Sequence, residues 1–473
     1  MSASVSPLDA TSARLCAAVA GWRYEDLTGD VVGTIKRFIM DTLGVIGGAA
    51  RAPGIEALHA RARHWEHDGS ATALLGHRSC SPPTAALLNG AAAHALDYDD
   101  LHDGARVHTN CVVLPAVLAT AQDVGGVSGR DFILAMAVGT EIHARLGLAC
   151  PGSLAKGWHP TTVLGTLAAA LAAGIVRKLD ATALNHALGI AFHQTCGTAQ
   201  SIRDGALSKR VGAGFASRNA VWAAALAADG ITGPHRALEG DAGLFALYER
   251  GEAQQARLFA ALGEDWRVTE YSIKPYPCCR CMHTVIGIGI DLHRQGVHAD
   301  DVARAEVRMG EVNVQTVGGA YDAARASVVH AQFSAAYGFA RALVDGRAGL
   351  SAFQQPAIAD ARVAAMADRV RVVADDAIQA NAIEPARVRL TLRDGRIIDT
   401  GRDTMKGSPQ APLSDTEFEV KFDECMTYGL AASEAAIARL ASAIRELQDA
   451  PDAAHALVSA FPAPVAPPHG SVQ

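Results

Sequence analysis

Hydrophobic side chains recur at helical spacing through residues 1–268, and the alternation that marks strands is scarce there. Residues 31–46 are typical, because Ile35, Ile39 and Ile46 fall on one face and two glycines end the pattern. The same spacing predicts further helices over 84–96, 115–123, 129–149, 160–177, 180–196 and 214–229. Residues 1–268 are therefore predicted to form the first part of a helical domain.

The pattern changes over residues 269–405. Polar and apolar residues alternate as in strands over 267–274, 305–314 and 369–373. Residues 386–392 and 397–400 flank the pair Asp394-Gly395, which favours a tight hairpin turn. Helical spacing over 282–295 and 329–346 separates these strands. Residues 269–405 are therefore predicted to form a smaller α+β domain.

Helical spacing returns over 414–425 and 431–447, so residues 406–448 are predicted to complete the helical domain. The tail at 449–473 is rich in Pro and Ala and is predicted to be disordered. The expected fold class is mainly α, with a smaller α+β domain inserted in a large all-helical domain. This organisation predicts a cleft between the domains, with the strand that ends at Lys274 forming one wall.

Composition narrows the function classes. The chain has 473 residues, 49% of them hydrophobic, which is ample for two domain cores. Its net charge is −7 and it has no basic run, so we expect no nucleic-acid partner. We see no signal peptide, and the longest apolar run, about 163–176, is too short to span a bilayer. Nine scattered cysteines fit a reducing compartment, so we expect a cytoplasmic protein without a membrane partner.

One short segment concentrates ionisable groups. Residues 94–108 hold four aspartates, three histidines and one arginine, between the apolar segments 82–93 and 111–121. Charged groups are rarely buried unless they are paired or functional, and imidazole transfers protons near neutral pH. This polar segment is therefore predicted to form the floor of a site. The alternative is a helix end with solvated charges.

Two patterns raise the question of a metal. Residues 99–103 fit the DDxxD motif with which terpene and prenyl synthases hold Mg²⁺, but no second metal motif accompanies it. Residues 278–283 read CCRCMH, but the second ligand pair of a zinc site is absent from the sequence. No metal is therefore expected. The sequence also has no phosphate-binding loop, dinucleotide fingerprint or nucleophile elbow, so no organic cofactor is implied.

Two further motifs offer cations next to a helix start. His159 precedes Pro160, so it is predicted near an N-cap, where a bound anion would be favoured. Lys209 and Arg210 precede a glycine-containing helix, which suits carboxylate binding or a lysine of lowered pKa. The alternatives are a capping or core histidine and a solvated cation pair.

A fourth motif lies at the predicted domain junction. Two prolines hold residues 272–283 extended, so that Lys274, Arg280 and several thiols are presented there. Tyr321 is a further candidate proton donor.

Taken together and in order, these motifs resemble the MmgE/PrpD family. They are HALDYDD at 94–100, GWHP at 157–160, LSK at 207–209 with SRNA at 217–220, GITGP at 230–234 with EGD at 239–241, and KPYPCC at 274–279. The family includes 2-methylcitrate dehydratase, cis-aconitate decarboxylase and iminodisuccinate epimerase, and the resemblance runs from about residue 30 to about 445. It implies a helical domain with an α+β lid, a homodimer, and no metal or organic cofactor.

The resemblance also implies a site. The catalytic residues carried over are Asp97, His108, His159, Lys209 and Lys274. The substrate-binding candidates are Arg280, Cys279, His283, Tyr321 and Arg210. We expect Lys209, Lys274 and Arg280 to hold the carboxylates of a small acid. His108 and His159 would exchange protons, and Asp97 would orient an imidazole.

Three departures bear on the activity. Leu101 and Cys279 stand where the decarboxylases have threonine and histidine, and Lys209 is followed by Arg-Val-Gly instead of Pro-Leu-His. We therefore expect a lyase acting on a small di- or tricarboxylate by proton transfer next to a carboxylate, foremost a 2-methylcitrate dehydratase-like hydro-lyase. The alternatives are an epimerase or isomerase of an imino- or amino-dicarboxylate, a cis-aconitate-type decarboxylase, and a catalytically silent scaffold or binding protein.

Overall fold

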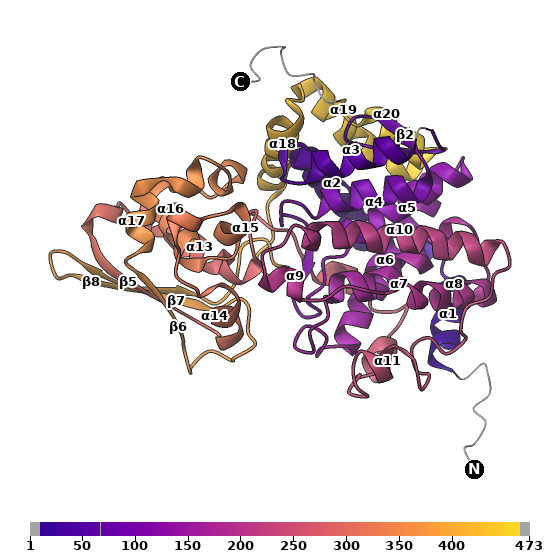
Figure 1. The fold of residues 1–473 in the computed structure, drawn as a ribbon, viewed down its shortest axis with the longest axis horizontal. Coiled ribbons are helices and arrows are strands. Elements are labelled where there is room, and N and C mark those ends of the chain that lie inside the picture. Colours follow the sequence, from indigo (N-terminus) through magenta and orange to yellow (C-terminus); the bar gives the residue numbers. More distant parts are fainter. Residues whose placement is uncertain (1–9, 67, 464–473) are drawn as a thin grey trace. The chain divides into compact units, whose positions relative to one another are not determined.

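A computed structural model describes residues 10–66 and 68–463 of the chain. The chain divides into two compact units, shown in Figure 1. The helical unit contains the residues up to Ala95, then Asp99–Tyr271, and those from Phe422 onward. The sheet unit contains Leu96–Tyr98 and Ser272–Lys421. Each unit is described separately below.

The helical unit is built mainly from long helices. These are α1 (Thr11–Gly21), α2 (Gly29–Gly48), α3 (Ile55–Trp65), α4 (Pro82–Ala93), α5 (Asn110–Val124), α6 (Gly129–Ala149), α7 (Pro160–Val176), α8 (Ala181–His193), α10 (Ser208–Ala228), α19 (Glu434–Arg445) and α20 (Ala453–Ala460). Helix α18 (Asp415–Leu430) crosses the boundary between the units. The short elements are α9 (Gln200–Arg203), α11 (Leu244–Leu247), α12 (Ala256–Phe259), β1 (Ala71–Ala73), β2 (Arg78–Cys80), β3 (Leu101–His102) and β4 (Tyr271–Ser272).

Helices α4, α5, α7 and α10 pack together at the centre of the helical unit. Glycine allows the closest approach: a Cβ added at Gly90 of α4 would lie 2.9 Å from Cα of Gly214 in α10. A Cβ added at Gly214 would lie 2.2 Å from the carbonyl oxygen of Leu87. Because neither position has room for a side chain, the starts of α5, α7 and α10 are held close to the end of α4. Those helix ends carry the site.

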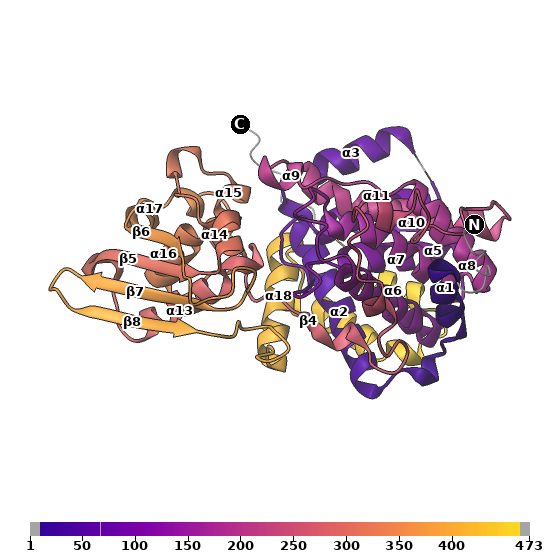
Figure 2. The ribbon, with the colours of Figure 1, turned by 90° about the horizontal axis from the view of Figure 1, so that it is seen from below.

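The sheet unit contains a four-stranded sheet in the order β6-β5-β7-β8, visible in Figure 2. Strand β5 (Val302–Met309) pairs in parallel with β6 (Val370–Ala374) and antiparallel with β7 (Ala386–Leu392), which pairs antiparallel with β8 (Ile397–Arg402). The helices of this unit are α13 (His283–Arg294), α14 (Glu311–Val317), α15 (Val328–Gln332), α16 (Ala335–Asp345) and α17 (Ala361–Ala367). Figure 1 shows α13, α16 and α17 on one face of the sheet.

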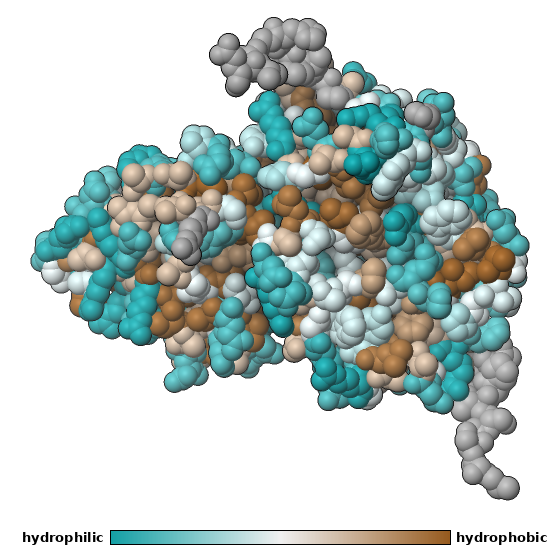
Figure 3. Space-filling model, in the orientation of Figure 1, coloured by the Kyte–Doolittle hydropathy of each residue, from teal (hydrophilic) through white to brown (hydrophobic). Residues whose placement is uncertain are grey.

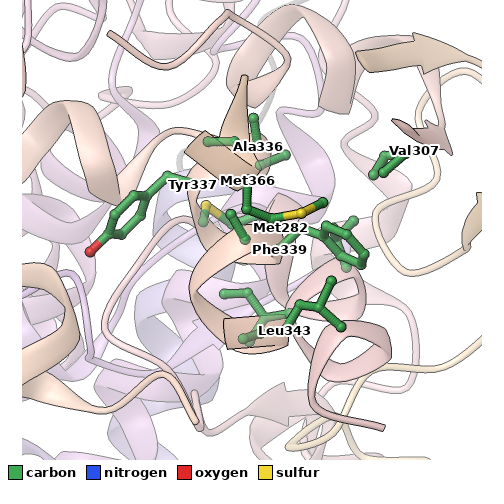
Figure 4. Close-up of a cluster of buried hydrophobic side chains, with 14 of the residues drawn as sticks. Met282, Val307, Ala336, Tyr337, Phe339, Leu343 and Met366 are labelled. Carbon is green, nitrogen blue, oxygen red and sulfur yellow. The ribbon is translucent and has the colours of Figure 1, made fainter. Parts of the chain in front are cut away.

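Strict alternation along β7 separates the two faces of this sheet. Val388 and Leu390 of β7 are fully buried, whereas Arg389 between them is exposed. The buried face packs against Met282, Phe339 and other side chains of a core that Figure 4 shows. Burial of one such Val or Leu stabilises the fold by about 1.5–3 kcal/mol.

The structure confirms a mainly α fold and several predicted elements. The hairpin around Asp394-Gly395 is present as β7 and β8, with the register Thr391↔Ile397. Helix α6 has the predicted bounds, 129–149. That the sheet unit acts as a lid stays a prediction.

Other predictions about elements were wrong. The strand expected at 305–314 ends at Met309, because Gly310 starts helix α14. In place of the strand expected at 267–274 there is a 3₁₀ turn over Arg267–Glu270 and a two-residue strand. Helix α5 begins at Asn110 and contains Pro115, which we had placed at its start.

The predicted disordered tail also needs correction. Residues 453–460 form helix α20, whose first turn is capped by Asp452, the acceptor from the His455 N–H at 2.9 Å. Leu457 of this helix is buried, and the Pro- and Ala-rich composition gave no indication of that burial. The rest of that prediction, residues 464–473, lies outside the described residues.

Among the described residues, one helix is long and apolar enough to span a membrane. This is α6, and 94% of its most apolar window is buried inside the protein. Such burial is typical of a central core helix, so its hydropathy is accounted for by packing.

The exposed surface mixes hydrophilic and hydrophobic areas, with hydrophobic area where α10 ends (Figure 3). Trp222 of α10 and Ile231 beyond it are 48% and 52% exposed.

Candidate active site in the helical unit

The connection from α4 to α5 carries the polar segment 94–108. His94 caps the C-terminal end of α4. Asp97 has a φ of 53° and Arg106 a φ of 55°, so the chain reverses direction at two points where it adopts left-handed backbone. The side chains of this segment are consequently divided between the two units. Asp97 belongs to the sheet unit, whereas Asp99 and His108 belong to the helical unit.

Asp99 is the centre of an imidazole cluster, which we define as His94, His108 and His159 around this carboxylate. Oδ2 of Asp99 lies 2.8 Å from Nδ1 of His94 and 3.1 Å from Nδ1 of His108. The rings of His94 and His108 meet edge to face, with centroids 4.9 Å apart. His159 stacks against His94 with a centroid distance of 6.1 Å. Asp99 and His94 are fully buried.

Burial and charge set the protonation of this cluster. Burial alone would raise the pKa of Asp99, but His94 and His108 outweigh it and hold that pKa well below its usual value. Burial lowers the pKa of His94 to about 4, so this ring is neutral at pH 7. The arrangement is therefore an ionised carboxylate that accepts N–H groups from neighbouring rings.

The neighbouring aspartate has a different role. Asp100 accepts hydrogen bonds from the backbone N–H groups of Thr109 and Asn110, at 3.4 and 3.2 Å, and so caps the start of α5. Burial, then Asp99 and Asp41, raise the pKa of Asp100 to about 8. Of the two adjacent carboxyl groups, Asp99 thus carries the charge and Asp100 the proton at pH 7.

His159 and Lys209 line one cavity of about 200 Å³. His159 is the N-cap residue of α7, and Lys209 lies in the first turn of α10. Most other lining residues carry hydroxyl, amide or thiol groups or are glycines, and the lining comprises Thr162, Thr166, Cys196, Gly197, Thr198, Ser201, Ser208, Gly212, Phe215, Ala216 and Asn219. Two helix N-termini, an ammonium group and several hydroxyls therefore meet at one small space. All of these features favour an anion.

Asp97 and Lys274 form a lysine–aspartate pair in the sheet unit. Nζ of Lys274 donates to the carbonyl oxygen of Asp97 at 2.8 Å and lies 3.4 Å from its Oδ2. Both side chains are buried, with 1% and 7% of their area exposed. Residues 96–98 are held there by further bonds: Tyr98 donates to the carbonyl of Pro275 and receives a bond from Lys421 on its own carbonyl.

Arg280 and His283 are fixed by their own unit. Arg280 donates to the hydroxyl of Ser272 at 2.9 Å and to the carbonyl of Lys406 at 3.0 Å, and its Nη1 lies 3.3 Å from Nδ1 of His283. Burial, then Arg280 and Lys274, hold the pKa of His283 well below its usual value. The pKa of Cys279 is raised well above its usual value by a hydrogen bond with Cys281 and by burial, so its thiol is protonated.

Two predicted substrate-binding residues lie elsewhere. Tyr321 is buried in the core of the sheet unit, where it packs on Tyr337 at 4.7 Å and donates to the carbonyl of Ile358 at 2.5 Å. Arg210 is buried on α10, next to Lys209 but outside the cavity lining. The third imidazole of the polar segment, His102, lies 3.2 Å from Glu270 and accepts from the N–H of Ala105, which makes it part of the local turn.

The structure thus brings His108, His159 and Lys209 into the helical unit, together with two residues whose part the sequence analysis missed. His94 and Asp99 belong to the polar segment, but Asp97 was expected to orient an imidazole. The contacts with imidazole come from Asp99 instead. The left-handed turn at Asp97 separates the two aspartates, and hydrophobic periodicity carries no signal for such a turn.

One group in the described residues has the composition of a metal site. His94, Asp99 and Cys111 offer ligand atoms within 4.8 Å of one another, all buried. The donors do not fit a metal well. Oδ2 of Asp99 already faces two imidazole nitrogens, and burial, then Asp99 and Asp100, raise the pKa of the Cys111 thiol well above its usual value. A thiol that resists ionisation is a poor ligand.

Comparisons with known proteins place the chain among its relatives. Models of the MmgE/PrpD N-terminal and C-terminal domains match residues 13–256 and 276–447. The chain is 28% identical over 440 residues to the cis-aconitate decarboxylase-like protein oryM of Aspergillus oryzae, covering 88% of this chain and 90% of that protein. It is 29% identical to the cis-aconitate decarboxylase of Aspergillus terreus over 84% of this chain and 85% of that enzyme. For the cis-aconitate decarboxylase of Homo sapiens the identity is 27%, over 86% and 85%.

Proposed function

Because this chain belongs to the MmgE/PrpD family, we propose that it is a lyase that acts on a small di- or tricarboxylate by proton transfer next to a carboxylate. Its relatives named above are decarboxylases, which are lyase-type enzymes. The observation that carries the proposal is the cavity of about 200 Å³ where His159 and Lys209 meet at two helix N-termini.

The cavity supplies the binding half of the chemistry. Lys209 provides an ammonium group, and the N-terminal ends of α7 and α10 provide favourable dipoles. The hydroxyl groups of Thr162, Ser201 and Ser208 add neutral polar atoms to the lining. A substrate with several carboxylates can use all three kinds of group at once.

The imidazole cluster supplies the proton-transfer half. Loss of CO₂ breaks a carbon–carbon bond and leaves its electron pair on carbon, as a carbanion delocalised like an enolate. Lys209 stabilises that negative charge, and the ring of His159 or His108 then delivers a proton to carbon. In a dehydration the same groups would instead remove the proton next to the carboxylate and protonate the leaving hydroxyl.

Decarboxylation of an unsaturated tricarboxylate such as cis-aconitate is the first activity to test, because two of the relatives are cis-aconitate decarboxylases. Dehydration of a 2-methylcitrate-like acid is the second. It is favoured by Leu101, a buried hydrocarbon side chain in strand β3, and by Cys279. These stand where the decarboxylases have a hydrogen-bonding threonine and histidine. Epimerisation of an imino- or amino-dicarboxylate is the third.

The sheet-unit residues keep their predicted roles as proposals. Lys274 and Arg280 would contribute positive charge toward substrate carboxylates, and Asp97 would hold Lys274 through the lysine–aspartate pair. Cys279, His283 and Tyr321 of this unit, and Arg210 on α10 of the helical unit, stay proposed substrate-binding residues; each is buried or hydrogen-bonded in the described structure, so each would act through packing or hydrogen bonds. Catalysis without metal or organic cofactor, a homodimeric state and a cytoplasmic location likewise stay predictions.

The test is a panel of citrate, 2-methylcitrate, cis-aconitate and iminodisuccinate-type acids incubated with the protein in deuterated water. Released CO₂ identifies a decarboxylase, loss of water a dehydratase, and deuterium uptake without a new product an epimerase. EDTA should leave the rate unchanged if no metal takes part. No exchange with any acid would contradict the proposal and favour the catalytically silent scaffold.

A matched pair of lysine variants gives the control. Lys209→Met removes the charge at the cavity, whereas Lys178→Met removes an exposed charge that lies 3.9 Å from Asp131. Turnover should be lost in the first variant and kept in the second. Equal loss in both would indicate a general effect of charge on folding or solubility.

A further inference from the structure

Asp99 is the buried group that the proposed reaction leaves unused. It is fully buried, belongs to the helical unit, and is not among the residues that line the cavity. Its Oδ2 nevertheless faces the Nδ1 atoms of two imidazoles, at 2.8 and 3.1 Å. A carboxylate in such a place cannot touch a substrate in the cavity, so any effect on catalysis acts through the rings. His159, which stacks on His94, is the ring of the imidazole cluster that lines the cavity.

The chemistry of an ionised carboxylate fixes what those rings present. An ionised carboxylate only accepts hydrogen bonds, so an imidazole facing it must carry its hydrogen on Nδ1. Nε2 of the neutral ring then keeps its lone pair and is free to take up a proton. Nε2 of His94 has no hydrogen-bond partner among the described residues, which agrees with a ring held from its other side by the bond between Nδ1 and Asp99. Nδ1 of His108 lies 3.1 Å from the same carboxylate oxygen without the geometry of a hydrogen bond, so its alignment rests on this close contact.

We propose that Asp99 is a positioning residue that holds His94 and His108 as their Nδ1–H tautomers and so sets His108 to exchange protons through Nε2. The role in catalysis rests on the proposed function, whereas the tautomers do not. Asp99 takes the place that the sequence analysis gave to Asp97, whose carboxylate lies beside Lys274.

The groups packed around Asp99 are consistent with this assignment. His94 follows α4 and His108 precedes α5. Asp100 and Cys111 lie near the start of α5, and the positive charge of Lys209 on α10 acts on His94. Asp100 binds backbone N–H groups and contacts no imidazole in the described hydrogen-bond network, although it is equally buried. It therefore offers a matched control one position away.

The direct test is nitrogen-15 NMR of histidine-labelled protein, with His94 and His108 assigned by single substitution of each ring. In the wild-type protein, wherever either ring carries a single N–H hydrogen, that hydrogen should lie on Nδ1. Asp99→Leu removes the acceptor and should shift both rings toward the Nε2–H form, Asp99→Asn should shift them less, and Asp100→Asn should leave them unchanged. If neither Asp99 variant folds, the wild-type spectrum alone decides. Nε2–H tautomers there, or no shift in a folded Asp99→Leu protein, would overturn the proposal.

Kinetics test the catalytic part, on whichever acid the panel identifies. Asp99→Leu should lower kcat about 100-fold or more, the scale of one general acid–base group, and change KM less than about threefold, because Asp99 does not line the cavity. Asp99→Asn should fall between that variant and the wild type, and Asp100→Asn should stay within about threefold. An unchanged kcat in Asp99→Leu would overturn the positioning role. Absence of turnover in the wild type would count against the proposed function and leave the tautomer result standing.

Discussion

The two units treat buried charge in opposite ways. In the helical unit, one carboxylate faces two imidazoles, and an imidazole nitrogen of His94 is left without a hydrogen-bond partner among the described residues. In the sheet unit, the cations are held by oxygen atoms of their own unit: Lys274 by Asp97, and Arg280 by Ser272 and Lys406. The first arrangement places imidazole rings around an ionised carboxylate, with one ring nitrogen left unbonded. The second fixes charge in place. We therefore assign proton transfer to the helical unit and electrostatic support to the sheet unit.

The largest effect is expected at the cavity. His159→Gln keeps hydrogen-bonding capacity at the N-cap of α7 but removes the imidazole, and should lower kcat by about 10²–10⁴-fold, the range of general acid–base catalysis. The measurement is steady-state turnover on the acid that the panel identifies. His186→Gln, on a half-buried histidine of α8 outside the cavity lining, is the control. Similar losses in both variants would break the comparison between the units.

The next largest effect is on stability. Lys274→Met leaves the Asp97 carboxylate buried without its cation, which costs about 3–5 kcal/mol in comparable buried pairs. Urea unfolding followed by circular dichroism measures it. Lys274→Met with Asp97→Asn should recover part of the loss, because neither partner is then charged. If the single variant unfolds at the wild-type midpoint, the pair does not fix charge as we describe.

Acid should weaken the helical unit more than the sheet unit. Burial is the main cause that lowers the pKa of His59 and His94 to about 4 and of His143 to about 3. Below pH 6.5 these three histidines become protonated in the unfolded chain but stay neutral in the folded protein. The free energy of unfolding therefore falls as the pH drops toward 4, by up to about 1.4 kcal/mol per pH unit for each ring.

Asp100 opposes this trend, because its raised pKa of about 8 makes the folded state bind one proton more than the unfolded chain between pH 4 and 8. Urea midpoints at pH 7, 6 and 5 measure the balance. His59→Gln should reduce by one the number of protons taken up on unfolding, and so weaken the dependence of the urea midpoint on pH. His59 does not line the cavity. A stability that is flat over this range would show that the buried rings are protonated in the folded protein.

The smallest effect concerns substrate preference. Leu101→Thr restores the hydroxyl that the decarboxylases carry at this place, at the cost of some buried apolar area. One new hydrogen bond of about 1 kcal/mol would raise decarboxylation about fivefold relative to dehydration. Product analysis by NMR measures the ratio. Leu101→Val, which shortens the side chain without a hydroxyl, is the control, and an equal change in both variants would remove the threonine argument.

The sequence predicted the elements best where one local rule decides them. The hairpin at Asp394-Gly395 follows from a turn pair between alternating strands, and α6 from unbroken helical spacing. Element ends were less predictable, because Gly310 turns a strand into a helix and Pro115 sits inside α5, where tertiary packing outweighs the local preference.

The candidate site was predictable in composition and less so in its pairings. The polar segment 94–108 stood out because it interrupts apolar sequence. Which aspartate faces which partner depends on the φ of 53° at Asp97 and on tertiary bonds from Lys274 and Lys421, which join positions far apart in the chain. Residue spacing does not predict such long-range contacts. The different partners of Asp97 and Asp99 are therefore visible only in the structure.

Solvent deuterium incorporation into product, measured by mass spectrometry, tests the central claim most directly. The wild type, His159→Gln, His108→Gln and Lys274→Met are compared in deuterated water on the same acid, with folding checked by circular dichroism. We predict that each histidine variant forms deuterated product at least about 100-fold more slowly at saturating substrate, and that Lys274→Met acts mainly through stability and KM. Both histidine variants working at the wild-type rate while folded Lys274→Met loses kcat would contradict the assignment of proton transfer to the helical unit.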